Sequence, residues 1–126
     1  MIILINSFSP NMLGQARAYL EWTPISLSEI ISLLGEESFT SHMGQANVAN
    51  VFSIMTGFLV RVNRKPYYLH RNDTIIQVQY IGPYFDENDT KLPENGRLTY
   101  WRIRPMELKN SFKVSNTEIL TLSNGE

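Results

Sequence analysis

The segment from Ser41 to Gly57, SHMGQANVANVFSIMTG, predicts a short amphipathic helix that follows a polar, glycine-containing entry. Its apolar residues are spaced i, i+3, i+4 and i+7, which places one set on a single buried helix face: Val48, Val51, Phe52 and Met55. Gly57 stands where a residue in the left-handed conformation commonly ends a helix. We therefore place a core helix of the fold in this segment.

The entry to this helix is unusual because almost nothing covers its free backbone N–H groups. Gly44, Gln45, Ala46 and Asn47 offer backbone N–H groups and two side-chain amides. Unpaired N–H groups and the helix dipole both favour an anion such as phosphate. An ordinary core helix with a glycine entry is the simpler interpretation of this segment alone.

Upstream of this helix, the chain predicts two strands and a second helix. Residues 1–5 form a continuous apolar run, typical of a strand that is buried on both faces. Ser9 can cap a turn with Pro10 at its first position, and residues 17–23 alternate like a half-exposed strand. Ser26 and Glu29 have the spacing of a capping box that begins a helix ending near Gly35.

Downstream, the pattern predicts short strands at 58–62 and 66–70, a clear strand at 74–81 and a last main strand at 98–104. Residues 82–97 form a long polar loop, which in so small a domain is more often functional than decorative. This order predicts an α+β fold with a single mixed sheet of five to six strands and two main helices on it. We expect one domain over residues 1–108. Residues 109–126 would be a C-terminal extension that serves as an edge hairpin, an oligomer arm or a tail.

The composition restricts the class of function. The chain of 126 residues has 11 basic and 12 acidic residues and no cysteine. A net charge of −1 argues against binding of long nucleic acid, and the absence of cysteine excludes disulfides and a thiol nucleophile. Two isolated histidines do not suggest a metal, no cofactor is expected, and no apolar run could span a membrane. We expect a cytoplasmic protein.

None of the common catalytic motifs occurs, so individual residues carry the remaining chemical signals. Asp86, Glu87 and Asp89 could supply a catalytic carboxylate, although a solvated acidic loop is the more frequent explanation. His42 could act as a general base, but a lone loop histidine is more often a surface residue. The residues alone thus indicate a small α+β protein with a possible site for a phosphorylated ligand.

Several segments together resemble one protein family, in order and at compatible spacing. Residues 5–13, INSFSPNML, resemble its N-terminal N-A-F-S-x-N-M-L signature, and residues 41–45, SHMGQ, resemble its S-x-x-G-H segment. Residues 62–64 match its V-N-R, while residues 79–87, QYIGPYFDE, and the later LPENG resemble its Q-Y-x-G-P loop. The family is that of the viral type III anti-CRISPR ring nucleases and their small bacterial and prophage relatives.

This resemblance implies a homodimer that binds a cyclic oligoadenylate second messenger across its two-fold axis. Members of the family degrade cyclic tetra-adenylate without a metal and so silence host immunity. The ligand's own 2′-hydroxyl attacks, a histidine serves as general acid, and a loop glutamate and an arginine assist. Carried over to this sequence, the resemblance predicts that the ligand is bound by Asn6, Ser9, Asn11, Gly44, Gln45, Arg64, Tyr84 and Glu87.

The sequence departs from the family at two of these positions. Gln45 replaces the histidine, and a glutamine cannot exchange a proton near pH 7. Tyr84 replaces the loop arginine, so a fixed charge is lost and a stacking surface is gained. Glu87 keeps the position of the loop glutamate. The recognition groups are thus largely present while the general acid is absent.

The leading hypothesis is therefore a phage or prophage anti-defence protein that binds and sequesters a cyclic nucleotide immune messenger without cutting it. The alternative is a metal-independent ring nuclease in which Glu87 and His42 carry the proton transfers. A third hypothesis keeps the fold for a protein–protein effector, in which residues 109–126 would matter most.

Overall fold

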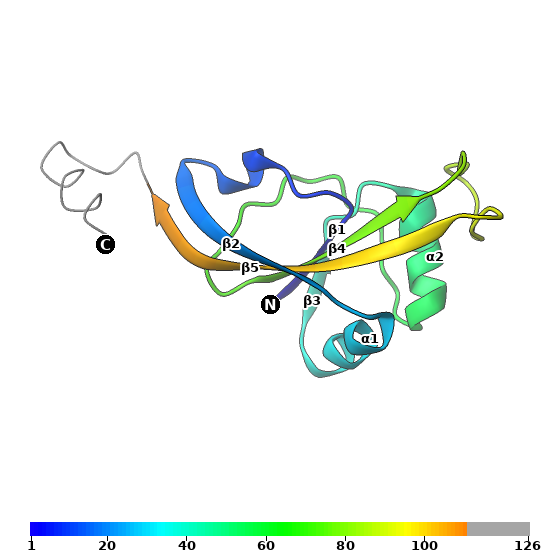
Figure 1. Ribbon diagram of the computed structural model, residues 1–126, viewed down its shortest axis with the longest axis horizontal. Helices are drawn as coiled ribbons and strands as arrows, with labels where there is room; N and C mark the ends of the chain where they lie inside the picture. Colours follow the sequence, from blue (N-terminus) through cyan, green and yellow to red (C-terminus); the bar gives the residue numbers. More distant parts are fainter. Residues whose placement is uncertain (111–126) are drawn as a thin grey trace, which may run out of the picture.

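The computed structural model describes residues 1–110, which form one mixed five-stranded sheet with two α-helices (Figure 1). The helical segments are the 3-10 turn η1 (Pro10–Leu13), α1 (Leu27–Glu36) and α2 (Ala46–Thr56). The strands are β1 (Ile2–Ile5), β2 (Ala16–Pro24), β3 (Phe39–Ser41), β4 (Thr74–Ile81) and β5 (Arg97–Asn110). The α+β class and the single mixed sheet are confirmed.

The strand order is β2-β5-β4-β1-β3, with a parallel half and an antiparallel half. β1 pairs in parallel with both β3 and β4, whereas β5 pairs antiparallel with β4 and β2. The carboxyl ends of β1, β3 and β4 therefore meet at one edge of the sheet. Ile5, the last residue of β1, pairs with Gln77, so β4 continues past the end of β1 as far as Ile81.

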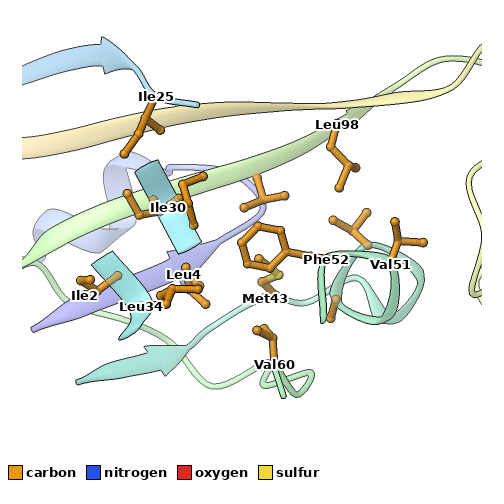
Figure 2. Packing of buried hydrophobic residues seen from close by; sticks show 14 of the residues in the cluster. Ile2, Leu4, Ile25, Ile30, Leu34, Met43, Val51, Phe52, Val60 and Leu98 are labelled. Carbon is orange, nitrogen blue, oxygen red and sulfur yellow. The ribbon is translucent and has the colours of Figure 1, made fainter. Parts of the chain in front are cut away.

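Each face of the sheet has its own hydrophobic layer. Ile2 and Leu4 pack with α1 and α2 in the larger cluster, around the fully buried Phe52 (Figure 2). Ile3 and Ile5 point to the opposite face, where η1 and the segment with Tyr67 cover the sheet. All four residues of β1 are buried, which confirms the prediction of a strand enclosed on both sides. Each such side chain contributes about 1.5–3 kcal/mol of hydrophobic stabilisation.

Capping residues fix the ends of the helical segments as the sequence predicts. Ser9 caps η1, with Pro10 at its first position, and its hydroxyl accepts from the amide of Asn11. Ser26 and Glu29 form the complete capping box of α1. Gly57 ends α2 in the left-handed conformation, with φ at 79°. These local rules act over a few residues, so tertiary context does not overturn them.

The strands predicted at 58–62 and 66–70 are wrong, because the structure has no strand there. Val60 donates its amide to the hydroxyl of Ser53 and accepts from the same hydroxyl, so its backbone pairs with α2 and not with a strand. Leu69 donates its amide to the carbonyl of Met12 in η1. Both segments cover the layers of the core as irregular chain.

The three-residue strand β3 was not predicted, because Phe39–Ser41 is too short to show an alternating pattern. Met55 was also placed wrongly on the buried face of α2. It is 38% exposed, while Ala49 and Thr56 are buried instead. Thr56 can be buried because its hydroxyl donates to the carbonyl of Phe52 at 2.8 Å.

β5 is longer than the predicted strand at 98–104, since it extends to Asn110 beside β2. The paired strands β2 and β5 therefore project beyond the rest of the sheet (Figure 1). The first two residues of the predicted 109–126 extension belong to β5. The remainder of that extension lies outside the described residues.

Candidate functional site

A polar hollow of about 510 Å³ lies at the edge of the sheet where β1 and β4 end and α2 begins. We call it the α2 hollow. It is lined by Asn6, Ser7, Gly44, Gln45, Asn47, Val48, Gln79, Tyr80, Gly82, Pro83, Tyr84, Phe85 and Glu87. Residues that follow the carboxyl ends of parallel strands are commonly used for ligands in sheets of this kind.

Asn6 joins the elements that surround the α2 hollow. Its side-chain oxygen accepts from the amide of Gln45 at 2.9 Å, and its side-chain nitrogen donates to the carbonyl of Val78 at 3.2 Å. The residue that follows β1 thereby holds both the entry of α2 and the neighbouring strand β4. Because both ends of its amide are used, Asn6 acts mainly as a support for the hollow.

The start of α2 opens into the hollow without a conventional cap. Gln45 occupies the N-cap position, and its side chain makes no capping hydrogen bond. Asn47 accepts from the amide of Val48 and donates to the carbonyl of Phe85. Among the described residues, no side chain caps the amides of Ala46 and Asn47. Asn47 lines the α2 hollow and Ala46 precedes it, so the positive end of the helix dipole and the N–H group of Asn47 provide a favourable place for an anion there.

Arg64 lies at the rim of the hollow and connects its two sides. Its Nε donates to the carbonyl of Gly44 at 3.0 Å, and its Nη2 pairs with Oε1 of Glu87 at 3.1 Å. The side chains of Arg64 and Glu87 are 62% and 70% exposed. The guanidinium is thus fixed near the start of α2 while most of its surface remains accessible.

The loop after β4 forms the outer wall of the hollow. Phe85 is buried and packs on the ring of Tyr80, with ring centroids 4.8 Å apart. Tyr84, its neighbour, is 84% exposed. Gly82 has a φ of 148°, and a Cβ there would lie 2.7 Å from the Cα of Gly96, so the two ends of the loop approach too closely for another residue. The loop therefore presents the exposed ring of Tyr84, whose hydroxyl donates to the carboxylate of Asp86 at 3.4 Å.

Three of the predicted site residues lie elsewhere. Ser9, Asn11 and His42 line a second hollow of about 660 Å³, the η1 hollow, together with Pro10, Met12, Gly14, Gln15, Lys65, Pro66, Tyr67 and Tyr68. The two hollows share no lining residue. His42 has its Nδ1 2.9 Å from the carbonyl oxygen of Lys65, and its ring packs beside that of Tyr67.

Tyr67 is a fixed hydrogen-bond donor at the base of the η1 hollow. Its hydroxyl donates to the carboxylate of Asp73 at 2.6 Å. Burial, and then this hydrogen bond, raise the pKa of the Tyr67 hydroxyl well above its ordinary value, so the group stays protonated. Tyr67 therefore supplies neither a base nor a proton near neutral pH.

The structure thus brings together Asn6, Gly44, Gln45, Tyr84 and Glu87, with Arg64 at their rim, and separates them from Ser9, Asn11 and His42. Sequence reasoning did not assign a site role to several lining residues, among them Ser7 and Gln79. The signal that could have found them is position, since each lies at the end of a strand or the start of a helix. Within residues 1–110, no three His, Asp or Glu side chains come together as a metal site.

Within residues 1–110, no helix is long and apolar enough to cross a membrane.

The fold is similar to that of B116 of Sulfolobus turreted icosahedral virus (STIV), with a TM-score of 0.66. That alignment covers 82% of this chain and 97% of B116 at 14% sequence identity, so it shows a shared fold alone. Comparison with curated proteins gives no match. A family model described as STIV B116-like matches residues 2–95, which include every residue of both hollows, and the chain therefore belongs to the STIV B116-like family.

Proposed function

We propose that this protein is a viral or prophage anti-defence protein that binds a cyclic nucleotide immune messenger in the α2 hollow and holds it uncut. The observation that carries the proposal is the start of α2, where Gln45 makes no capping hydrogen bond and which borders a polar hollow beside Arg64. Membership of a family named after a viral protein is consistent with a viral origin. The resemblance to ring nucleases suggests a cyclic oligoadenylate as the ligand.

A phosphate of the ligand is the first group to place. The amides of Ala46 and Asn47 can donate to its oxygens, since no side chain among the described residues caps them. Arg64 lies close by, because its Nε is bonded to the carbonyl of Gly44 at the entry of α2. A guanidinium and helix N–H groups together match the geometry of a phosphate better than a single lysine does.

An adenine of the ligand can stack on the exposed ring of Tyr84. Stacking of a base on an aromatic side chain contributes about 1–3 kcal/mol. Gln79 also lines the hollow and is exposed, so its amide can donate to and accept from a base edge. Tyrosine at this loop position thus offers recognition of a base in place of a charge.

Among the described residues that line the α2 hollow there is no histidine. Gln45 cannot exchange a proton near neutral pH, and His42 lines the other hollow, with its ring against Tyr67. Loss of a general acid typically slows a reaction by about a hundred- to ten-thousand-fold. A protein that binds the messenger tightly and cuts it slowly still lowers its free concentration by mass action.

Slow ring-nuclease activity is the second candidate, and Glu87 favours it. This carboxylate lines the α2 hollow and, among the described residues that line it, is the one charged group. It could accept a proton from a ribose hydroxyl once its pair with Arg64 is broken. Two copies of the chain around a two-fold axis, as the resemblance implies, would allow one ring to be held by two hollows.

The test mixes the purified protein, in molar excess and with EDTA present, with a panel of cyclic di-, tri-, tetra- and hexa-adenylate. Free nucleotide is measured, the protein is heat-denatured, and the released nucleotide is analysed. We expect depletion of one member of the panel and recovery of the intact ring. Linear fragments would indicate the nuclease instead, and no depletion of any member would contradict both and leave a protein-partner effector.

A further inference from the structure

The electrostatics of the α2 hollow conflict with an anionic ligand in one respect. Glu87 is the one charged residue among those that line it, and it is negative. The nearest cation described at the rim, Arg64, is already paired with that carboxylate. A phosphate that enters the hollow therefore meets a repelling charge, together with a guanidinium whose Nη2 is occupied.

We propose that Glu87 is a selectivity gate. Its carboxylate pairs with the same guanidinium group of Arg64 that an anionic ligand would bind, so a ligand must displace this carboxylate in order to bind well. The proposal rests on the proposed function of the α2 hollow. It assigns Glu87 a role opposite to that of a ligand-binding group, because its removal should strengthen binding.

Because Arg64 and Glu87 are exposed, replacement of the Glu87 carboxylate by a ligand anion should cost little free energy. The two side chains are more than half exposed, and exposed ion pairs contribute little to stability because water and salt screen them. Arg64 would not collapse once Glu87 leaves, since its Nε stays bonded to the carbonyl of Gly44 at 3.0 Å. The guanidinium can thus change partners at Nη2 without losing its position.

The pair also connects the loop to the opposite side of the hollow. Residues 62–64 are held to the entry of α2, since the amide of Asn63 donates to the carbonyl of Met43 at 2.8 Å. Glu87 is three residues from the exposed Tyr84 on the same loop. Release of Glu87 by a phosphate would therefore coincide with contact of the loop tyrosine with the base. A ligand with both a phosphate and a base gains from both contacts, whereas inorganic phosphate gains from one.

Glu87→Gln tests this proposal, because the amide keeps the shape of the side chain and removes its charge. We expect the dissociation constant for the depleted cyclic nucleotide, measured by calorimetry, to fall about two- to fivefold, in proportion to the weak pair that is removed. Asp89→Asn is the matched control. It removes the same charge from the same loop, outside the α2 hollow, and should leave the affinity within about a factor of 1.5.

The variants Arg64→Ala and Arg64→Ala/Glu87→Gln show whether the effect passes through Arg64. We expect the gain from Glu87→Gln to shrink when Arg64 is absent. Unchanged or weaker binding by Glu87→Gln would overturn the gate alone, since the wild type would still bind the nucleotide. No binding of any panel nucleotide by the wild type would overturn the proposed function and the gate with it.

Discussion

The starts of the two α-helices differ in how their backbone amides are satisfied. At α1, Ser26 accepts from the amide of Glu29, and the Glu29 carboxylate accepts from the amide of Ser26. At α2, Gln45 makes no capping bond with its side chain, and the helix opens into a polar hollow. Both helices pack on the same face of the sheet (Figure 1). At both starts the amides of the N-cap residue and of the third helical residue are thus satisfied by side chains, by the local Ser26–Glu29 pair at α1 and by Asn6 and Asn47 at α2. The starts differ in which residues supply these bonds and in that the start of α2 borders the α2 hollow.

A capping side chain contributes about 1 kcal/mol to a helix start. Ser26 supplies it at α1, whereas at α2 the N-cap residue Gln45 supplies none and Asn47 accepts from the amide of Val48 in its place. α2 is also held in place by its packing, because Val48, Val51 and Phe52 are buried in the core.

Removal of Arg64 should have the largest effect on nucleotide affinity at the start of α2. Arg64→Ala deletes the cation nearest to the proposed phosphate position, and hydrogen bonds to charged groups contribute about 1.5–3 kcal/mol. We expect at least a tenfold loss of cyclic nucleotide affinity in calorimetry. Arg61→Ala is the matched control, because Arg61 is exposed and lines neither hollow. Equal affinity of both variants and wild type would show that the phosphate lies elsewhere.

Loss of the exposed ring of Tyr84 should have the next largest effect on nucleotide affinity. Tyr84→Ala removes one base-stacking surface, which contributes about 1–3 kcal/mol, and should weaken nucleotide binding accordingly. Tyr84→Phe keeps the ring and should bind nearly as wild type. Because Tyr84 is 84% exposed, neither change should alter the melting temperature. Tyr68→Ala makes the same change in the η1 hollow, and a larger effect there would move the ligand to that site.

A capping side chain introduced at Gln45 should raise the stability of the protein and weaken nucleotide binding. Gln45→Asp supplies a capping carboxylate, so we expect the free energy of unfolding to rise by about 0.5–1 kcal/mol while nucleotide affinity falls. Gln45→Asn caps without adding charge and should weaken binding less. Chemical denaturation and calorimetry on the same samples measure both quantities. An increase in stability without any loss of affinity would mean that the amides of α2 do not meet the ligand.

Removal of the capping hydroxyl at the start of α1 should affect the stability of the protein and not its nucleotide affinity. Ser26→Ala deletes the capping hydroxyl of α1 and should lower the free energy of unfolding by about 1 kcal/mol. Nucleotide affinity should stay at the wild-type value, because Ser26 lines neither hollow. A change in affinity in the folded variant would contradict the separation of the two helix starts.

The capping box of α1 should also carry a small acid dependence. Hydrogen bonds from Ser26 lower the pKa of the Glu29 carboxyl in the folded state. The stability that this provides is complete above the unfolded-state pKa of Glu29 and is lost as the pH falls through the lowered folded-state pKa. Denaturation of wild type and Ser26→Ala across acidic pH should therefore show a smaller difference at the lowest pH values.

The sequence predicted the features that depend on neighbouring residues. The Ser26 capping box, the left-handed Gly57 and the fully buried β1 are set within a few positions of the chain. It failed where the partner lies far away. The amide of Val60 is bonded by a serine of α2, and Phe39–Ser41 becomes a strand only because β1 lies beside it.

The site was predicted in part for the same reason. The sequence indicated that almost nothing covers the N–H groups at the start of α2. The structure shows that Gln45 makes no capping bond with its side chain, but that Asn6 and Asn47 accept from the amides of Gln45 and Val48. It did not indicate that Ser9, Asn11 and His42 would lie in a separate hollow. That separation depends on how η1 and residues 65–68 fold over the second face of the sheet, which no local pattern describes.

Backbone amide chemical shifts test the comparison of the two helix starts most directly. The ¹H–¹⁵N spectrum of the protein would be recorded with and without the cyclic nucleotide that it depletes. The account predicts large shifts for the amides of Ala46 and Asn47 and none for those of Leu27 and Ser28 at the start of α1. Shifts concentrated at Asn11, Lys65 and Tyr68 in the η1 hollow, with Ala46 and Asn47 unmoved, would contradict it.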